Sequence, residues 1–172
     1  MKAKPLYIIV DRKDRIIGYK TKNAIRKSDI YRVSGLVLVN KKKEILLAQR
    51  SWNKSHNPGK WGASAAGTIE KGESYRANII KEAKEEVGFP VKRLKLGPRY
   101  FRRGDHLYFC QWFFARCDWP VEKFRLEKSA VAGVRWASVQ EIRRLLKEKP
   151  SVVFGRVSHW ETVFRQLSRE GY

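Results

Sequence analysis

The chain has 172 residues, of which 42% are hydrophobic and 12% aromatic. This length and composition fit one globular domain over 1–172 and exclude a disordered or fibrous protein. No apolar run approaches the roughly 20 residues that a membrane-spanning helix requires, and the first residues lack a signal-peptide core. Two cysteines, Cys110 and Cys117, are too few for a secreted disulfide framework. We therefore expect a cytoplasmic protein with no membrane partner.

The chain is strongly basic. Lysine and arginine number 38 against 17 aspartates and glutamates, which gives a net charge of +21. Such a charge concentrates polyanions near the surface, so a small phosphorylated, nucleotide-like substrate is the expected partner and a nucleic acid is a possible one. The basic residues are scattered, however, and solvated lysines without a binding role would give the same composition. No nucleic-acid recognition motif is visible.

The predicted elements begin with strands and end with helices. In the first half we expect an N-terminal extension hairpin within residues 1–30, with strands at 6–10 and 15–18, then a central strand pair at 33–39 and 44–49 and a strand at 61–66. The second half predicts a helix at 74–87, strands at 94–101, 106–117 and 132–137, and two terminal helices. Ser138 and Ser158 are each followed three residues later by glutamate, and this capping-box pattern predicts where the terminal helices begin. This order of elements predicts an α+β (mixed α/β) fold.

The segment from Gly67 to Phe89 carries the most chemical information. A glycine loop leads into a helix whose last turns hold Glu82, Glu85 and Glu86. At about 100° per residue these carboxylates share one arc, beside an apolar arc that can pack on a sheet. They repel one another, and the helix dipole disfavours anions at this end. A divalent cation such as Mg²⁺ or Mn²⁺ would remove the conflict, because hard cations prefer oxygen ligands.

Spacing alone leaves an alternative open, since Lys81 and Lys84 could neutralise an ordinary solvated helix face. The full pattern, however, resembles the Nudix box of residues 67–89. After the glycine come five residues, Glu73, seven residues, and a segment that ends with Gly88 and Phe89. Every fixed position matches except Lys81, where that family has arginine. Segments outside the box that also resemble the family are 46–51, 58–61 and 134–142.

The resemblance implies a Nudix fold, a mixed sheet sandwiched between helices, and hydrolysis of a diphosphate linked to another moiety. It implies that the carbonyl of Gly67 and the carboxylates of Glu82, Glu85 and Glu86 hold Mg²⁺ or Mn²⁺. The metal would lower the pKa of an attacking water, and Glu82 or Glu85 would act as the base or assist it. Some family members use a later acid, for which Glu127 is the candidate, although its sequence context is more typical of a surface loop.

Lysine at position 81 departs from the resemblance. It keeps the charge of the family's arginine but lacks the planar fork that could hold two carboxylates, including Glu73, at once. We expect Lys81 to belong to the catalytic set, to position the glutamates less firmly than arginine would, and to slow turnover without abolishing metal binding.

The N-terminal part resembles the branch that contains isopentenyl-diphosphate isomerase and its hydrolase relatives. The similar segments are 10–11, 16–18 and 31–33. That isomerase has a cysteine directly before the box glycine and histidine ligands nearby, whereas Ala66 precedes Gly67 here and Tyr31 stands at a ligand-histidine position. Without a thiol to move a proton or imidazoles for a second metal, isomerisation is the least favoured reaction.

Basic side chains near the box could bind substrate phosphates. The candidates are Arg32, Arg50 and Lys60, with Lys54 beside them. Each could equally be a surface charge, and Arg50 is the strongest. Four aromatic residues could stack on a base or line the core: Trp52, Trp61, Tyr108 and Trp112. The core is favoured for Trp61 and Trp112. Three histidines lack metal-ligand spacing, so we expect structural or exposed roles for His56, His106 and His159.

Three functions remain open at this point. The first is a metal-dependent Nudix pyrophosphohydrolase that cleaves a diphosphate linkage in a nucleotide or a similar nucleoside-diphosphate-linked substrate. The second is an RNA 5′-end pyrophosphohydrolase. The third is a nucleic-acid-binding module that retains the fold, against which the acidic trio argues, because a protein that only binds phosphates gains nothing from carboxylates facing them.

Overall fold

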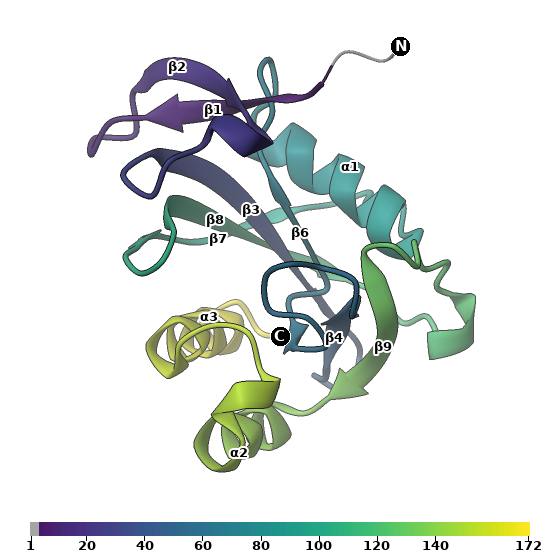
Figure 1. Cartoon of the computed structure of the whole chain (residues 1–172). Helices are drawn as coiled ribbons and strands as arrows, with labels where there is room; N and C mark the ends of the chain where they lie inside the picture. Colours follow the sequence, from purple (N-terminus) through teal and green to yellow (C-terminus); the bar gives the residue numbers. More distant parts are fainter. Residues whose placement is uncertain (1–3) are drawn as a thin grey trace.

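The computed structural model describes residues 4–172, and its mixed sheet lies between helices on both faces (Figure 1). This arrangement confirms the predicted α+β fold class. The strands are β1 (Leu6–Val10), β2 (Ile16–Thr21), β3 (Ile30–Val39), β4 (Ile45–Arg50), β5 (Trp61–Gly62), β6 (Ala65–Thr68), β7 (Lys95–Arg102), β8 (Leu107–Arg116) and β9 (Val131–Ala137). The α-helices are α1 (Tyr75–Val87), α2 (Val139–Glu148) and α3 (Val157–Arg169), and short 3₁₀ turns occur at Lys22–Ala24, Val121–Lys123 and Pro150–Val152. No helix in this described part of the chain has the length and apolar character needed to cross a bilayer.

Strand β3 is the centre of the sheet. It pairs in parallel with β8 from Ile30↔Leu107 to Val39↔Arg116, and antiparallel with β6 on its other side. Both faces of β3 are buried over most of its length, which explains why its sequence is apolar at successive positions rather than alternating. The expected pairing of β3 with β4 is confined to Val39↔Ile45.

A single strand over 61–66 was predicted, but the structure has two, β5 paired with β4 and β6 paired with β3. Ser64 lies between them and is fully buried. Its hydroxyl accepts from Leu38 N at 2.8 Å and donates to Leu46 O at 2.7 Å. The serine thus bridges β3 and β4 where they diverge, and the chain crosses from one strand to the other at this point.

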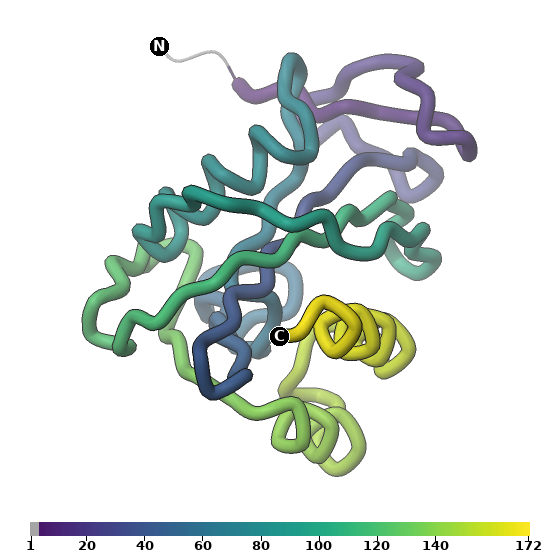
Figure 2. Tube along the Cα trace, turned by 180° about the vertical axis from the view of Figure 1, so that it is seen from behind, coloured from purple at the N-terminus to yellow at the C-terminus, as the bar shows by residue number. Residues whose placement is uncertain are grey.

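Of the three hydrophobic clusters, the two larger ones lie on the two faces of the sheet, and the third joins the N-terminal hairpin to Ile30 and Ile69. On one face Leu36 and Leu46 pack with Ile79 and Val87 of α1. The other face packs against α2 and α3, and the core residues that these helices contribute are Ile142, Leu146, Trp160, Val163, Phe164 and Leu167. Figure 2, seen from behind, shows the same separation of α1 from the two C-terminal helices. Cys110 and Cys117 are free and belong to different cores.

Of the two helix caps predicted for the terminal helices, one is present in the structure. The Ser138 hydroxyl accepts from Glu141 N at 3.1 Å and caps α2 as predicted. Helix α3 instead begins at Val157, so Ser158 lies inside it and the predicted cap is wrong. The Glu161 carboxylate does not accept a bond from the backbone at the start of the helix, because it accepts two bonds from Arg143 of α2 at 2.7 and 2.8 Å. That pair stabilises the packing of the two helices instead.

The predicted N-terminal hairpin is formed by β1 and β2, and residues 1–3 of its expected range lie outside the described part. Strand β1 also bonds to the glycine loop before α1, with Ile8 N donating to Ile69 O at 3.1 Å and Lys71 N donating to Leu6 O at 2.7 Å. The hairpin therefore supports the loop between β6, which carries Gly67, and α1.

The hairpin turn is tied to the rest of the fold by one buried carboxylate. Asp14 has φ of 60° and accepts from Arg32 Nε at 2.8 Å and from the Tyr75 hydroxyl at 3.2 Å. Arg99 of β7 donates to the same carboxylate. Because Tyr75 is the first residue of α1, the turn fixes the start of the helix that holds the acidic residues.

Candidate active site

Helix α1 has clear boundaries. The Ser74 hydroxyl accepts from Ala77 N at 3.1 Å, and Gly88 ends the helix in the left-handed region with φ of 69°. Ile79, Ala83 and Val87 are fully buried, so the predicted apolar arc packs on the sheet. The acidic arc is left beside β6.

Two of the three predicted carboxylates lie against the backbone of β6. A Cβ atom at Gly67 would be 2.2 Å from Glu82 Oε1, so only glycine permits this approach. Glu86 Oε2 accepts from Ala66 N at 3.0 Å. Glu85, the third carboxylate, is exposed on the same helix. The structure thus brings Gly67, Glu82 and Glu86 together.

The carboxylates are held where their charge is unfavourable. Burial, and after it the neighbouring charge of Glu86, raises the pKa of Glu82 to about 7. Burial also raises the pKa of Glu86, although the bond from Ala66 N and the positive charge of Arg50 act in the opposite direction. The repulsion expected from the sequence is therefore present, and a cation at this point would lower both pKa values.

The residues around Gly67 fit a magnesium-like ion. Within residues 4–172 no three acidic, histidine or cysteine side chains converge closely enough to enclose a metal by themselves. Mg²⁺ rarely needs such a cage, because one or two carboxylates hold it while water and substrate phosphates complete the octahedron. Glu82, Glu86 and the Gly67 carbonyl are hard oxygen donors of this kind, and Glu85 lies one turn away.

A buried amide holds the acidic residues in place, and sequence reasoning missed it. Asn78 is fully buried in α1, and its side-chain nitrogen donates to Glu73 Oε2 at 2.8 Å and to Glu82 Oε1 at 3.3 Å. Its oxygen accepts from the Ser34 hydroxyl of β3. The signal was the helical spacing of four between Asn78 and Glu82, which places both on one face.

Lys81 contacts two carboxylates despite lacking the fork of an arginine. Its Nζ lies 2.6 Å from Glu73 Oε1 and 3.3 Å from Glu70 Oε1. These contacts lower the pKa of Glu73 and raise that of Lys81, in each case against an opposing effect of burial. Lys81 therefore orders the loop before α1, and it acts on Glu82 through Glu73 and Asn78 rather than by a direct bond.

A cavity of about 890 Å³ opens beside Ala66, Gly67 and Glu86. Of the predicted phosphate-binding residues, Arg50 and Lys60 line it. Its basic lining residues are Lys22, Arg26, Lys27, Arg50, Lys60 and Arg102. Its aromatic and histidine lining residues are Tyr7, Tyr31, His56, His106, Tyr108 and Phe154. An acidic edge therefore meets a basic and aromatic cavity.

Comparison with known proteins agrees with this geometry. The NUDIX domain model matches residues 30–155. The chain belongs to the Nudix hydrolase family. A Nudix hydrolase of Yersinia pestis is 31% identical over 156 residues, which are 90% of this chain and 84% of that protein. A prenyl-diphosphate phosphatase of Methanosarcina mazei is 28% identical over 143 residues, 82% of this chain and 84% of the relative.

The fold of this Nudix hydrolase has solved counterparts. The crystal structure of DR0079 from Deinococcus radiodurans superposes with a TM-score of 0.73 at 21% identity, over 93% of this chain and 98% of that one. The predicted Nudix fold, with its mixed sheet sandwiched between helices, is therefore confirmed. At this identity the likeness shows the fold alone.

Several predicted site residues of the Nudix hydrolase do not line the cavity, and two of them, Arg32 and Glu127, bond to other parts of the fold. Arg32 was expected to bind phosphate, but it is not among the cavity-lining residues, because its guanidinium donates to Asp14 on the other face of β3. Glu127 is exposed, and its carboxylate accepts from Ser129 N at 3.1 Å. It stabilises a turn, as its basic surroundings indicated, while its backbone N–H donates to Glu86 O at 3.0 Å.

His56 is exposed, as expected of the histidines from the sequence. His56 and His106 both line the Nudix cavity, with ring centroids 4.6 Å apart in an edge-on arrangement. They come from loops far apart in the sequence, and no motif links them. His159 does have a structural role, because it stacks on Tyr100 at 3.9 Å. Trp112 is buried in the core as predicted.

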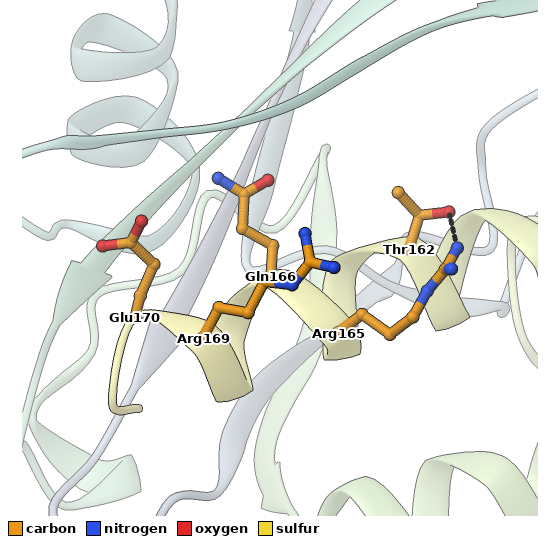
Figure 3. A pocket seen from close by; sticks show the side chains of 5 residues that line it. All are labelled: Thr162, Arg165, Gln166, Arg169 and Glu170. Atoms are coloured by element: carbon orange, nitrogen blue, oxygen red, sulfur yellow. Dashed lines mark hydrogen bonds between the residues drawn. The ribbon is translucent and has the colours of Figure 1, made fainter.

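Another hollow, of about 450 Å³, lies along α3 and carries no comparable chemistry. Its lining residues come from one helix and its end, and Figure 3 shows them side by side: Thr162, Arg165, Gln166, Arg169 and Glu170. The Gln166 amide donates to Leu96 O at 3.1 Å, and Arg165 contacts Thr162 at 3.4 Å. These residues are engaged in local packing, so the cavity beside Gly67 remains the candidate active site.

Proposed function

We propose that this Nudix hydrolase is a metal-dependent pyrophosphohydrolase that cleaves a diphosphate linkage in a nucleotide or a similar nucleoside-diphosphate-linked substrate. The observation that carries the proposal is the junction of Glu82, Glu86 and Gly67 with a cavity lined by Arg50 and Lys60. Carboxylates suit a cation, and the basic residues suit phosphate oxygens. A diphosphate held across this junction would touch both.

The residues divide the work as follows. When bound, Mg²⁺ or Mn²⁺ would neutralise diphosphate charge and lower the pKa of an attacking water. Glu82, Glu86 and the Gly67 carbonyl would hold that ion, with Glu85 completing the acidic set. Arg50 and Lys60 would bind phosphate oxygens and orient the scissile bond.

Proton transfer requires a carboxylate near the attacking water. Glu85, which is exposed, or Glu82 would accept the proton released by that water. Lys81 and Asn78 would position these groups without touching the substrate.

A second candidate substrate is a prenyl diphosphate, the class named for the Methanosarcina relative. The apolar part of the cavity, which includes Val33, Tyr108 and Phe154, could take a short hydrocarbon chain. Six basic lining residues favour a more highly charged ligand, so the nucleotide class ranks first. Isomerisation has little support, because both cysteines of the chain are buried in the cores.

A substrate panel tests the proposal. It contains nucleoside di- and triphosphates, sugar nucleotides, dinucleoside polyphosphates, capped and 5′-triphosphorylated RNA, and prenyl diphosphates, each assayed with Mg²⁺ and with a chelator. We expect diphosphate cleavage that the chelator abolishes and that Glu86→Gln lowers by about 100-fold or more. Glu148→Gln, an exposed change on α2, is the control.

Two outcomes would contradict the proposal. One is hydrolysis that survives both the chelator and Glu86→Gln. The other is an absence of hydrolysis together with RNA affinity that falls steeply with salt and ignores Glu86→Gln, which would identify a nucleic-acid-binding module instead.

A further inference from the structure

Four cations gather at the end of the cavity that is remote from Glu86: Lys22, Arg26, Lys27 and Arg102. The first three lie between β2 and β3, and Arg102 is the last residue of β7. None of the four forms a salt bridge within the described residues 4–172. Asp105 is the one acid that lines this end, so the local charge is strongly positive.

The sheet register separates this cluster from the carboxylates. Gly67 pairs with Ser34 of β3, whereas Tyr108, the partner of Arg102, pairs with Tyr31. Three residues along a strand correspond to about 10 Å. The backbone of Arg102 is therefore offset along the sheet from that of Gly67. Lys27 lies near Arg102, because both charges act on His106, whereas Arg50 and Lys54 are the cations that act on Glu86. The cluster would thus face a different part of the substrate.

Arg102 has an unfilled hydrogen-bonding requirement. Its Nη1 is buried and has no hydrogen-bond partner. The guanidinium lies over the rings of Tyr108 and Phe154, with its carbon 5.7 and 5.2 Å from their centroids. A guanidinium keeps its charge in any protein environment, and buried donors are nearly always paired. A phosphate oxygen entering this end of the cavity would supply the missing acceptor and a counter-charge.

His106, which precedes β8 and lies near Lys27 and Arg102, supplies a ring surface to this end of the cavity. Burial, and after it the nearby His56, lowers the pKa of His106. A neutral His106, with Tyr31 at a centroid distance of 6.4 Å and His56 at 4.6 Å, offers ring faces and edges to an uncharged connecting group.

We infer that Arg102, with Lys22, Arg26 and Lys27, forms a second anion subsite, which takes a phosphate monoester carried by the substrate at the end remote from the scissile diphosphate. This inference rests on the proposed function and narrows it to diphosphates that bear an additional phosphate, such as one on a ribose hydroxyl. It gives Nη1 of Arg102 a hydrogen-bond acceptor and explains why four cations share one end of the cavity.

Matched ligand pairs that differ by one such phosphate test the subsite. The pairs are coenzyme A with 3′-dephospho-coenzyme A, and NADP⁺ with NAD⁺. For each pair, Kd is measured by calorimetry without metal and kcat/KM is measured with Mg²⁺. We expect the phosphorylated member of at least one pair to be preferred by about tenfold, the effect of one charge-assisted hydrogen bond.

Three variants locate the preference. Arg102→Gln should remove it, and Lys27→Gln, an exposed loop change that does not endanger folding, should reduce it by several fold. Arg103→Gln is the control, because Arg103 is exposed beside Arg102 but does not line the cavity. Equal affinity within both pairs, or a preference that survives both Arg102→Gln and Lys27→Gln, would overturn the subsite.

The two proposals fail in different ways. If no ligand is hydrolysed but the Kd preference is present and depends on Arg102, the subsite stands and the proposed hydrolysis fails. If hydrolysis occurs without any preference in Kd or kcat/KM, the proposed function stands and the subsite is refuted.

Discussion

The backbone of Gly67 and the carboxylate of Glu82 are in such close contact that a methyl group at position 67 would lie 2.2 Å from Glu82 Oε1. The contact joins strand β6 to α1. The Glu82 carboxylate can occupy its position only because residue 67 has no side chain.

Gly67→Ala should therefore displace Glu82 by about an ångström and lower kcat by about 100-fold, since errors of this size at a reacting centre carry such costs. Gly18→Ala is the control, because nothing lies within 4 Å of the added methyl group. Steady-state kinetics measures kcat, and circular dichroism checks that the fold is intact. A Gly67→Ala enzyme with unchanged kcat would show that Glu82 can move without consequence.

Asn78→Ala and Ser34→Ala form a second test. Both lose the bond between the Ser34 hydroxyl and the Asn78 oxygen, but only Asn78→Ala also loses the donors to Glu73 and Glu82. We expect each to lower the free energy of unfolding by about 1–3 kcal/mol, and only Asn78→Ala to weaken Mg²⁺ binding by about tenfold in calorimetry. Equal metal affinity in the two variants would reduce Asn78 to a purely structural role.

The stability of the metal-free protein should depend on pH through Glu82. Its pKa of about 7 in the folded chain lies above the ordinary value of 4.5. Between these pH values the folded state holds a proton that the unfolded chain has released, so the free energy of unfolding falls as pH rises and levels off above about 7. Urea unfolding should show that Glu82→Gln removes part of this fall. Identical pH profiles for the variant and the native chain would contradict the assignment.

Lys81 offers a test of the departure from the family pattern. Lys81→Ala leaves Glu70 and Glu73 without their shared cation, and it should lower kcat several-fold and the free energy of unfolding by about 1 kcal/mol or less, since the pair is partly exposed. Lys81→Arg should raise kcat, because a guanidinium can bond both carboxylates with fixed geometry. If neither change affects kcat, Lys81 has no positioning role.

Local patterns in the sequence predicted much of the fold. The hairpin at the N-terminus, helix α1 and the Ser138 cap follow from contacts within a few residues. The division of 61–66 into two strands could not be foreseen, because it depends on Ser64 bonding to β3 and β4 at once. Ser158 failed as a cap for a similar reason, since Glu161 pairs with another helix.

The candidate site shows the same limit. The acidic set on α1 could be identified because one helix carries it, and Arg50 and Lys60 lie close to it along the chain. The partner of Arg32 depends on a turn that the fold brings across the sheet. The meeting of His56 with Arg102 and His106 likewise depends on the parallel register of β3 and β8, which no local pattern encodes.

The carboxylate of Asp14 has a practical consequence for anyone who shortens this protein. The family match starts at residue 30, yet Asp14 is the acid that neutralises Arg32 and Arg99 and holds Tyr75 at the start of α1. A fragment cut at the family boundary would leave two guanidinium groups facing each other without a counter-ion and would free one edge of the glycine loop. The N-terminal hairpin is therefore needed to hold α1 and the loop before it in place, and it should be kept in any shortened version of the protein.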